Sequence, residues 1–344
     1  MAHEITLVPG DGIGPTITDA TVRVLEAAGF EAEWDRHIAG VTATEQGMDP
    51  LPAETLQSIR DRRLALKGPL TTPVGAGFRS INVAMRQEFD LYANLRPARS
   101  MMSGGRYDDI DLVIVRENTE GLYAGIEHYI GMEDDPKAVA ESVMLITRFA
   151  SERIVRYAFE YALDHDRDKV TLVHKANILK CTQGLFLEVG RQVAEEYEGQ
   201  IEFEDKIVDN TAMQLVVDPY QFDVLVTENM FGDILSDQVA GLIGGLGFAP
   251  GANIGEDAAI FEPVHGSAPD IAGEGVANPT AQILAACLML DHLDEAEMAE
   301  RIRSSIRSVL DRGEVRTPDL GGDATTEEFA DAVIAEVESG AVRV

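Results

Sequence analysis

The sequence predicts a two-domain α/β fold in which a central sheet is flanked by helices. Apolar segments of strand length alternate with amphipathic helical segments along most of the chain. Several strand segments are apolar almost throughout, which is typical of strands buried on both faces of a sheet. A chain of 344 residues is longer than most single domains, so we expect two.

The individual elements follow from these patterns. Strands are expected at Glu4–Val8, Arg63–Lys67, Asp111–Arg116, Ala140–Thr147, Val170–His174 and Asp223–Thr227. Helices are expected at Thr16–Ala28, Thr182–Tyr197, Phe231–Leu242 and Thr280–Leu310. The segment Ala140–Thr147 follows a polar turn, so it is expected to form a hairpin arm.

The charge balance excludes several classes of partner. The chain has 60 acidic and 28 basic residues and a formal net charge of −32, spread along its length. Such a surface repels nucleic acid and anionic membranes, so neither is expected as a partner. No apolar run approaches the roughly 20 residues of a membrane span, and the N-terminus lacks signal-peptide features, so we expect a cytoplasmic protein.

The two cysteines, Cys181 and Cys287, are too few for a disulfide framework and lack metal-site spacing. Both are expected to be buried free thiols, because cysteine is among the most buried residue types. Lysine is scarce, with six in the chain, and three of these fall between Lys169 and Lys180.

The stretch "VPGDGIGP" (Val8–Pro15) suggests a phosphate-binding turn. The dinucleotide fingerprint G-x-G-x-x-G needs a third glycine that packs a helix against a strand. After Gly10 and Gly12 that position holds Pro15. The spacing therefore favours a structural turn before a proline-started helix over a Rossmann loop.

Polar side chains cluster where several predicted elements begin or end. Asn82 and Arg86 share a helical face, and Ser80 lies near the start of that helix, where an anion is favoured. Tyr123 follows one strand and is a candidate general acid, while Lys175 follows another and is a candidate base. The structural alternatives are surface salt bridges, interfacial packing of the tyrosine and a solubilising lysine.

Two further clusters have ligand-like chemistry. Asp233 and Asp237 are four residues apart on a predicted helix, and with Asp209 they form an oxygen-only donor set that suits Mg²⁺ or Mn²⁺. In an acidic protein the same pair is also compatible with a solvated helix face. The segment Glu262–Pro279 is rich in glycine and polar side chains and is either a binding loop or a surface connector.

Together, "PGDGIGP", "NTEGLYAGIEH", "HKANILK", "VDNTAMQLV" and "GLIGGLGFAPGANIGEDAAIFEPVHG" resemble the β-decarboxylating dehydrogenase family. Its members act on isocitrate, 3-isopropylmalate or homoisocitrate, and these stretches look most like the NAD-dependent isocitrate branch. The resemblance implies an isocitrate/isopropylmalate dehydrogenase-like fold, not a Rossmann fold. It also implies a large cofactor-binding domain (1–98 and 252–344) and a small dimerisation, substrate and metal domain (99–251) with an arm near 128–147.

The resemblance further implies roles for individual residues. The substrate-binding set is Ser80, Asn82, Arg86, Arg96, Arg116 and Asn177. Tyr123 matches the general acid and Lys175 the catalytic lysine, while Asp209, Asp233 and Asp237 match the metal ligands. In such a homodimer Lys175 and Asp209 reach the partner's site. Implied NAD contacts are Ile13, Thr72, His265, Gly266, Ser267, Ala268, Asp270, Ile271 and Asn278.

The expected activity is NAD-dependent oxidative decarboxylation of isocitrate to 2-oxoglutarate and CO₂ with Mg²⁺ or Mn²⁺. The expectation of NAD rests on Asp270-Ile271, where NADP-using relatives have Lys-Tyr; an aspartate accepts hydrogen bonds from ribose hydroxyls and repels a 2′-phosphate. Isocitrate is favoured because Ser80 and Asn82 would be left unpaired beside an apolar substrate tail. Homoisocitrate and 3-isopropylmalate remain alternatives, as do a non-catalytic regulatory subunit and a Rossmann-type 2-hydroxy acid dehydrogenase.

We interpret the acidic excess as adaptation to a high-salt interior, because salt screens the repulsion between like charges. The melting temperature of the protein is therefore expected to rise as KCl increases from about 0.1 to about 1 M, where the Debye length falls from about 10 to about 3 Å. Thermal unfolding followed by circular dichroism measures this. A melting temperature independent of KCl would contradict the interpretation.

Overall fold

The computed structural model describes residues 2–71, 80–102 and 107–341. The chain divides into two compact units. Unit 1 comprises residues 1–89, 97–109 and 240–344, and unit 2 comprises residues 90–96 and 110–239. The predicted assignment of cofactor to one domain and of substrate and metal to the other stays a prediction.

Unit 1 contains a mixed sheet with the strand order β2-β1-β3-β12-β11. Its strands are β1 (His3–Val8), β2 (Ala32–Arg36), β3 (Leu64–Lys67), β11 (Pro250–Ile254) and β12 (Ala259–Pro263). Neighbouring strands are parallel except β11, which runs antiparallel to β12. The helices of this unit are α1 (Gly14–Ala27), α2 (Val41–Glu45), α3 (Ala53–Arg62), α4 (Ile81–Glu88), α9 (Thr280–His292), α10 (Ala296–Arg312) and α11 (Thr326–Ala341).

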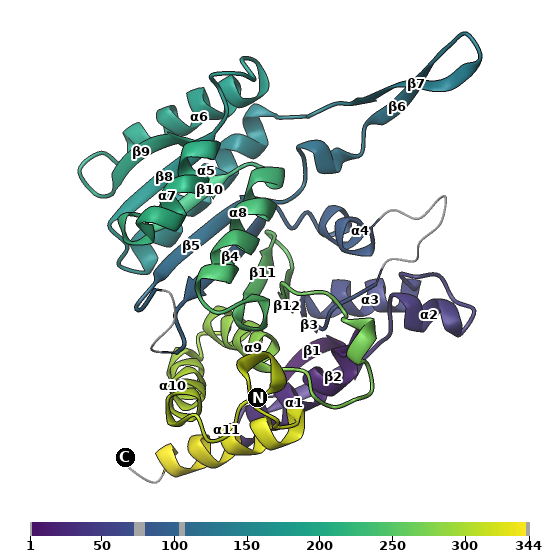
Figure 1. Ribbon diagram of the computed structural model, residues 1–344, viewed down its shortest axis with the longest axis vertical. Coiled ribbons are helices and arrows are strands. Elements are labelled where there is room, and N and C mark those ends of the chain that lie inside the picture. Colours follow the sequence, from purple (N-terminus) through teal and green to yellow (C-terminus); the bar gives the residue numbers. More distant parts are fainter. Residues whose placement is uncertain (1, 72–79, 103–106, 342–344) are drawn as a thin grey trace. The chain divides into compact units, whose positions relative to one another are not determined.

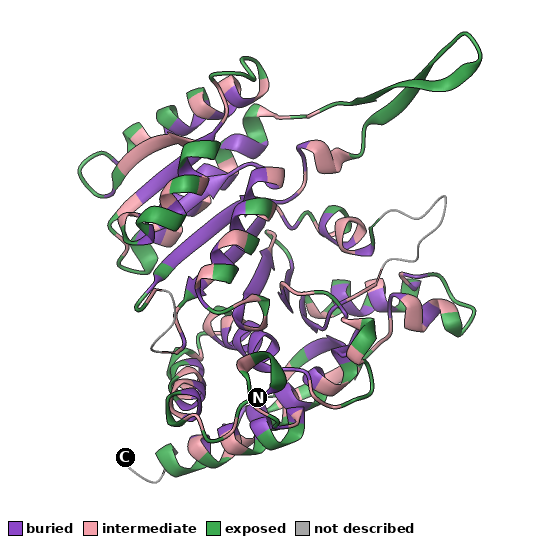
Figure 2. Cartoon of the chain, in the orientation of Figure 1, coloured by how far each residue is buried: buried purple, intermediate pink, exposed green. Residues whose placement is uncertain are grey.

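Helix α9 is the central helix of unit 1. It packs on β11, β12 and β3, and it also contacts α1 and α10. Ten of its residues are buried, because other elements pack against it on several sides, which explains why its sequence lacks an amphipathic pattern. Figure 2 shows α9 and the strands beneath it as mostly buried.

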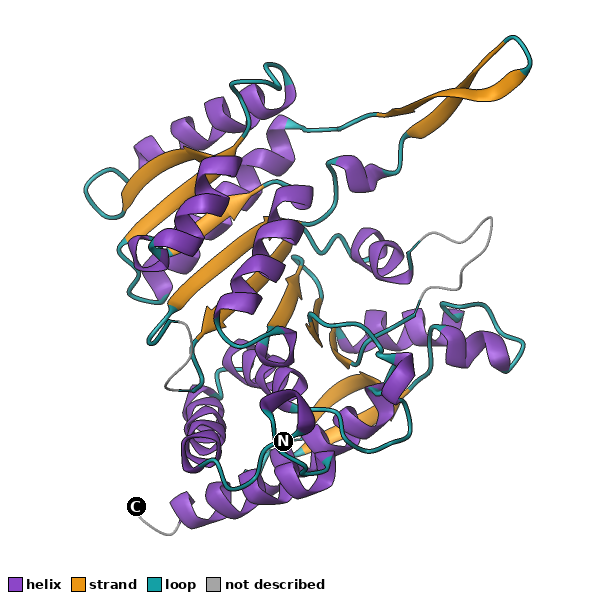
Figure 3. Cartoon of the chain, in the orientation of Figure 1, coloured by secondary structure: helices purple, strands orange, loops and turns teal. Residues whose placement is uncertain are grey.

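Unit 2 contains a parallel sheet with the order β5-β10-β8-β9. Its strands are β5 (Asp111–Glu117), β8 (Lys169–His174), β9 (Glu202–Ile207) and β10 (Val224–Thr227), and β4 (Ala93–Arg99) begins in this unit. The helices α5 (Arg148–Asp164), α6 (Thr182–Glu196), α7 (Val208–Val217) and α8 (Asn229–Leu242) lie around these strands (Figure 3). The apolar runs of β5, β8 and β10 are almost entirely buried, as their sequences predict.

A two-stranded antiparallel hairpin, β6 (Glu127–Met132) and β7 (Asp135–Ser142), extends away from the rest of unit 2 (Figure 1). Every residue of both strands is exposed. The hairpin lies at the predicted arm, but the strand expected at Ala140–Thr147 is wrong in its bounds: β7 ends at Ser142, because the chain reverses earlier, at 133–134, where Glu133 has a left-handed φ of 51°. At its base Gly121 and Leu145 form an isolated antiparallel bridge.

Two further expectations need correction. The segment Thr280–Leu310 forms two helices, because the chain turns at 293–295 and Asp294 adopts a left-handed conformation with φ of 63°. Cys181 is exposed, because it precedes α6 in a surface turn; Cys287 is buried in α9, and burial raises its pKa to about 12. In the described part of the chain no helix is long and apolar enough to cross a membrane.

The glycines of "VPGDGIGP" are required by close backbone packing within unit 1. A Cβ atom on Gly10 would lie 2.2 Å from the carbonyl oxygen of Pro69, and one on Gly12 would lie 2.0 Å from that of Ser267. Both glycines also have positive φ, of 84° and 59°. The turn ends at α1, which has proline in its first turn, as the sequence predicts.

Asp11 ties this turn to two other segments. Its carboxylate accepts hydrogen bonds from the backbone of Val41 (3.1 Å), Thr42 (2.8 Å) and Thr71 (2.8 Å), and from the Thr42 hydroxyl. Gly40 is needed beside it, because a Cβ there would lie 1.9 Å from Asp11 Oδ2. The loop Val8–Pro15 is therefore held to several other segments of unit 1 by hydrogen bonds and close backbone contacts.

We expect Gly12→Ala to destabilise unit 1 much more than Gly29→Ala. Both glycines have positive φ, so either alanine costs about 1–2 kcal/mol in a left-handed conformation. At Gly29 no atom lies within 4 Å of the added methyl, whereas at Gly12 the methyl overlaps the Ser267 carbonyl, which adds about 1–3 kcal/mol. The single tryptophan, Trp34, lies in β2 of unit 1, so its fluorescence during urea unfolding measures the effect. Equal losses for the two variants would show that the overlap is relieved without cost.

Candidate active site

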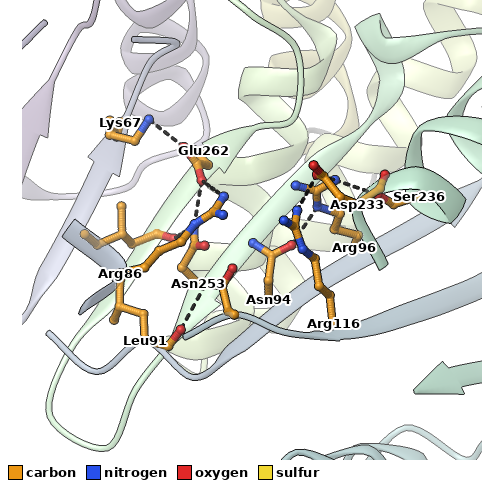
Figure 4. Close-up of polar contacts among 12 residues, drawn as sticks. Lys67, Arg86, Leu91, Asn94, Arg96, Arg116, Asp233, Ser236, Asn253 and Glu262 are labelled. Atoms are coloured by element: carbon orange, nitrogen blue, oxygen red, sulfur yellow. Dashed lines mark hydrogen bonds and ion pairs between the residues drawn. The ribbon is translucent and has the colours of Figure 1, made fainter. Parts of the chain in front are cut away.

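Strands β4 and β5 bring Arg96 and Arg116 to α8 (Figure 4), and Tyr123 follows β5 in the chain. Arg116, at the end of β5, donates to Asp233 Oδ1, and the Tyr123 hydroxyl donates to Asp233 Oδ2. Arg96 of β4 lies 3.5 Å from Asp233 and 3.6 Å from Asp237, one helical turn further on. The structure thus groups five of the predicted site residues.

Arg116 is fixed along its whole length. It is 1 % exposed, and its Nε and Nη2 donate to Asn229 Oδ1 at 3.1 and 2.8 Å. Its aliphatic part lies against Gly232, where a Cβ would approach to 2.6 Å. Its guanidinium lies 5.2 Å from the centre of the Tyr123 ring, a cation–π distance. Asn229 and Gly232 therefore orient Arg116 and Tyr123 toward Asp233.

Arg96 is held in the same way by neutral groups. Its Nε donates to Asn94 Oδ1 at 2.6 Å, and its Nη1 donates to the Ser236 hydroxyl at 2.5 Å. The residue is 8 % exposed. Asn94 and Ser236 fix the geometry of this arginine without neutralising its charge.

The two aspartates of α8 fit a divalent cation. Burial raises the pKa of Asp237; Arg96 opposes this rise, and the negative charge of Asp233 adds to it. A bound cation would relieve this repulsion, and carboxylate oxygens are donors that Mg²⁺ and Mn²⁺ prefer. Within the described residues of one chain, no three His, Cys, Asp or Glu side chains are grouped to hold a metal ion.

Lys175 and Asp209 form a separate pair in unit 2. The Lys175 ammonium hydrogen-bonds Asp209 Oδ1, and this bond lowers the pKa of Asp209. The side chain of Asp209 is 70 % exposed. Asn177, in the turn after β8, is exposed as well. This arrangement presents a lysine, an aspartate and an amide on the surface of one chain.

Unit 1 contains a buried charge cluster around Glu262, at the end of β12. Glu262 lies 2.5 Å from the Lys67 ammonium and 3.7 Å from Arg86, and it accepts from Asn253 at 2.8 Å. Burial alone would raise the pKa of Glu262, but the charges of Lys67 and Arg86 hold it at about 2. Glu262 is therefore ionised and fixes Arg86 in place.

Helix α4 presents the remaining predicted substrate residues. Ser80 precedes the helix as an exposed N-cap residue and makes no side-chain capping bond. Asn82 Oδ1 and Arg86 Nε are buried atoms without a hydrogen-bond partner. Because buried polar atoms are normally paired, the face of α4 that carries Asn82 and Arg86 is suited to a polar ligand.

The predicted cofactor loop adjoins the "VPGDGIGP" turn within unit 1. The amide of Ile13 donates to the carbonyl of Ser267 at 2.9 Å, and Ile13 packs in a cluster with Ala268 and Ile271. Gly266 and Asp270 are exposed, and Ala268 has a left-handed φ of 41°, a strained conformation for alanine. Backbone strain of this kind is common at ligand sites.

The other predicted cofactor residues have defined partners. His265 Nδ1 lies 2.9 Å from the carbonyl of Gly266, and burial lowers the pKa of His265. The Asn278 side chain bonds Asp319 and the amide of Thr280, both at 3.0 Å, so it braces the start of α9. Thr72 lies outside the described residues.

Sequence reasoning singled out none of the groups that position these arginines. Ser236, Asn229 and Glu262 act through contacts with residues far away in the chain. Asn94 and Asn253 act over two and nine positions, which the sequence patterns did not reveal either. One signal was present: Lys67 ends a fully buried strand in a chain with six lysines. A lysine in that position needs a buried carboxylate.

The fold and the buried arginines beside strand ends define a class of protein, namely α/β proteins that bind a small anionic molecule. The chain belongs to the isocitrate/isopropylmalate dehydrogenase family, whose model matches residues 4–333. It is therefore a dehydrogenase-family enzyme.

Two curated relatives and one solved structure illustrate the similarity. The chain is 49 % identical over 330 residues to an isocitrate dehydrogenase [NAD] catalytic subunit of Arabidopsis thaliana, covering 95 % of this chain and 87 % of that protein. It is 49 % identical over 342 residues to the isocitrate/homoisocitrate dehydrogenase of Thermus thermophilus, covering 98 % and 100 %. The crystal structure of isocitrate dehydrogenase from Methylococcus capsulatus is 58 % identical, with a TM-score of 0.94 and coverage of 98 % and 99 %.

Three buried glutamates lie near the base of the arm in unit 2. Glu117 and Glu228 accept backbone hydrogen bonds from the residues that follow them. Glu120 accepts from the amide of Thr147, the N-cap residue of α5. Burial raises the pKa of Glu120 to about 7, and the charge of Glu117 adds to the rise.

We expect Glu120→Gln to stabilise the protein at pH 8 but not at pH 5. Because the folded-state pKa is raised, the folded chain holds a proton that the unfolded chain releases between about pH 4.5 and 7, so this group's contribution to stability falls as pH rises through that window. Glutamine keeps an acceptor for Thr147 and cannot ionise. Glu195→Gln, on an exposed position of α6, controls for net charge. Chemical unfolding at both pH values measures the difference; equal effects of Glu120→Gln at both would contradict the assignment.

Proposed function

We propose that this protein is an NAD-dependent isocitrate dehydrogenase that converts isocitrate to 2-oxoglutarate and CO₂ with Mg²⁺ or Mn²⁺. One observation carries the proposal. Arg96 and Arg116 are almost completely buried, donate hydrogen bonds to the neutral oxygens of Ser236 and Asn229, and form ion pairs with the aspartates of α8. This arrangement suits a substrate whose carboxylates bind both arginines and a metal ion.

The chain's own residues take the following roles in this proposal. Arg86, Arg96 and Arg116 bind substrate carboxylates. Asp233 and Asp237, with Asp209 of the partner subunit, hold the divalent cation, which stabilises negative charge developing on the substrate oxygens. Lys175 of the partner subunit, after its ammonium has released a proton, takes up the hydroxyl proton, and Tyr123 delivers a proton to the carbon that loses CO₂. Asn177 orients the substrate beside Lys175.

The choice of isocitrate is supported by the polar end of α4. The unpaired oxygen of Asn82 and the exposed hydroxyl of Ser80 match a third carboxylate. An isopropyl group would leave the buried oxygen of Asn82 without a partner, at a cost of about 1–3 kcal/mol. Homoisocitrate is the alternative within the family, since the Thermus thermophilus relative is named for both substrates.

The choice of NAD is supported by the loop after β12. Asp270 is exposed there, and a carboxylate favours ribose hydroxyls over a 2′-phosphate. The apolar cluster of Ile13, Ala268 and Ile271 offers a face for the adenine. His265, Gly266, Ser267 and Asn278 complete the proposed cofactor site, with Thr72.

A homodimer is supported by exposed apolar side chains in unit 2. The arm exposes Tyr129, Ile130, Met132 and Val139, and α7 and α8 expose Met213, Val216, Val217 and Ile234. Surfaces of this kind mark protein contacts. A site shared between two subunits also explains why, within one chain, the Lys175–Asp209 pair is separate from the two aspartates of α8. The alternative, a non-catalytic regulatory subunit, is disfavoured because Tyr123, Lys175 and all three aspartates are present.

Steady-state assays with isocitrate, homoisocitrate and 3-isopropylmalate, each with NAD and NADP, test the proposal. We expect the highest kcat/KM with isocitrate and NAD, and loss of activity on removal of divalent cations with EDTA. A higher kcat/KM for homoisocitrate or 3-isopropylmalate would reassign the substrate. No turnover of any pair would favour a regulatory subunit.

A matched variant tests the coenzyme assignment. Replacing Asp270-Ile271 by Lys-Tyr should move the preference toward NADP by at least about tenfold, because a lysine pairs with the 2′-phosphate that the aspartate repels. Activity with NAD should fall in the same variant. Unchanged NAD efficiency would show that this pair does not contact the ribose.

A further inference from the structure

His174 occupies a buried position directly before Lys175. It is the last residue of β8, and it is 5 % exposed. Its imidazole Nδ1 lies 3.0 Å from the backbone nitrogen of Ala176, and its Nε2 lies 3.2 Å from Asp205 Oδ1. The hydrogen bond between the imidazole of His174 and the backbone of Ala176 therefore links the two residues that flank Lys175.

These contacts define the protonation of His174. A backbone N–H is always a donor, so Nδ1 must accept from Ala176 and carries no proton. The ring proton lies on Nε2 and is donated to Asp205. Burial lowers the pKa of His174 more than Asp205 raises it, so the ring is neutral.

Two further elements hold this tautomer. Asp205 lies on β9, where it is in register with Leu172, so it projects from the same face of the sheet as His174 two residues on. Its other oxygen accepts from Arg191 of α6 at 3.2 Å from Nε and 2.8 Å from Nη2. A series of hydrogen bonds thus runs from Arg191 through Asp205 and His174 to the backbone amide of Ala176, next to Lys175.

The backbone of Lys175 is fixed on its other sides as well. Its amide donates to Gln183 Oε1 at 3.2 Å, and its carbonyl accepts from Ile178 at 3.0 Å and Leu179 at 2.9 Å. With Ala176 held by His174, the Cα–Cβ direction of Lys175 is set. The ammonium then meets Asp209.

We propose that His174 is a positioning residue for Lys175 and that Asp205, with Arg191, holds it in the tautomer that this role requires. The role rests on the proposed function, in which Lys175 transfers the hydroxyl proton. Its consequence is a dependence on pH: a proton on Nδ1 would face the N–H of Ala176 and release the turn. Asp205 and Arg191 are the charged groups that act on this protonation, and Lys206 lines the same surface hollow.

Side-chain geometry supplies a matched set of variants. Asparagine places its Oδ1 where histidine has Nδ1, so His174→Asn keeps the acceptor for Ala176 and cannot be protonated. His174→Gln keeps a donor for Asp205 but no acceptor at the Nδ1 position, and His174→Ala keeps neither. His37, which pairs with Asp35 at 2.9 Å in unit 1, provides the control His37→Ala.

The kinetic test compares these variants in the intact protein with its preferred substrate. We expect His174→Ala and His174→Gln to lower kcat by about tenfold or more with little change in KM for NAD, because small displacements of a catalytic group are costly. His174→Asn should retain most of kcat and lose the acid-side fall in activity caused by protonation of the ring. Equal kcat for the asparagine and glutamine variants, or a loss in His37→Ala of the same size, would overturn the proposal.

A second measurement does not depend on turnover. Amide hydrogen exchange of the 175–179 turn should accelerate in His174→Ala and His174→Gln and stay slow in His174→Asn. Unchanged exchange in His174→Ala would overturn the proposal even if the enzyme is active. Fast exchange in His174→Ala and slow exchange in His174→Asn, in a protein that turns over no substrate, would support the role of His174 in holding the backbone next to Lys175. The same result would refute the proposed function.

Discussion

The candidate site of unit 2 depends on burying a permanent positive charge at the end of a sheet strand. Arg116 is 1 % exposed and cannot lose its proton, so the surrounding structure must supply oxygen acceptors for its guanidinium. Asn229 and Asp233 do so from the first two turns of α8, and Gly232 between them lets the helix lie against the arginine. The rotation and height of α8 follow from this requirement. The positions of Tyr123 and Asp237 follow in turn.

Unit 1 contains a buried negative charge, which its neighbours must likewise stabilise. Glu262 is buried and ionised because Lys67 and Arg86 are close to it, and Asn253 supplies a neutral donor. In both units neutral amides or hydroxyls add hydrogen bonds to ion pairs between the charged side chains. Such sites can bind a ligand of complementary charge, because folding has already removed their side chains from water and binding requires little further desolvation of them.

Much of the fold was predictable from local sequence. The apolar runs of β5, β8 and β10 lie within two residues of their predicted bounds, because strands buried on both faces need continuous apolar side chains. The proline-started α1 was predictable for similar local reasons, and so was the presence of a hairpin, although its second strand lies five residues earlier than expected. The single helix expected at Thr280–Leu310 was wrong, because an all-apolar helix and the amphipathic helix after it were read as one pattern. Cys181 was expected to be buried, but burial of a cysteine depends on what packs over it.

By itself the sequence determined which segments form strands and helices, the sign of the surface charge and the residue types available for chemistry. Only the tertiary structure decided which of them meet. Asn94 reaches Arg96 locally, but Ser236 reaches it from 140 residues away, and Lys67 reaches Glu262 across 195 positions of chain. The loop "VPGDGIGP" shows the difference most directly. Its glycines indicate a tight turn, but larger residues are excluded there because their Cβ atoms would overlap the carbonyls of Pro69 and Ser267. Hydrogen bonds and steric overlap act between atoms in space, whereas periodicity and spacing record only neighbours along the chain.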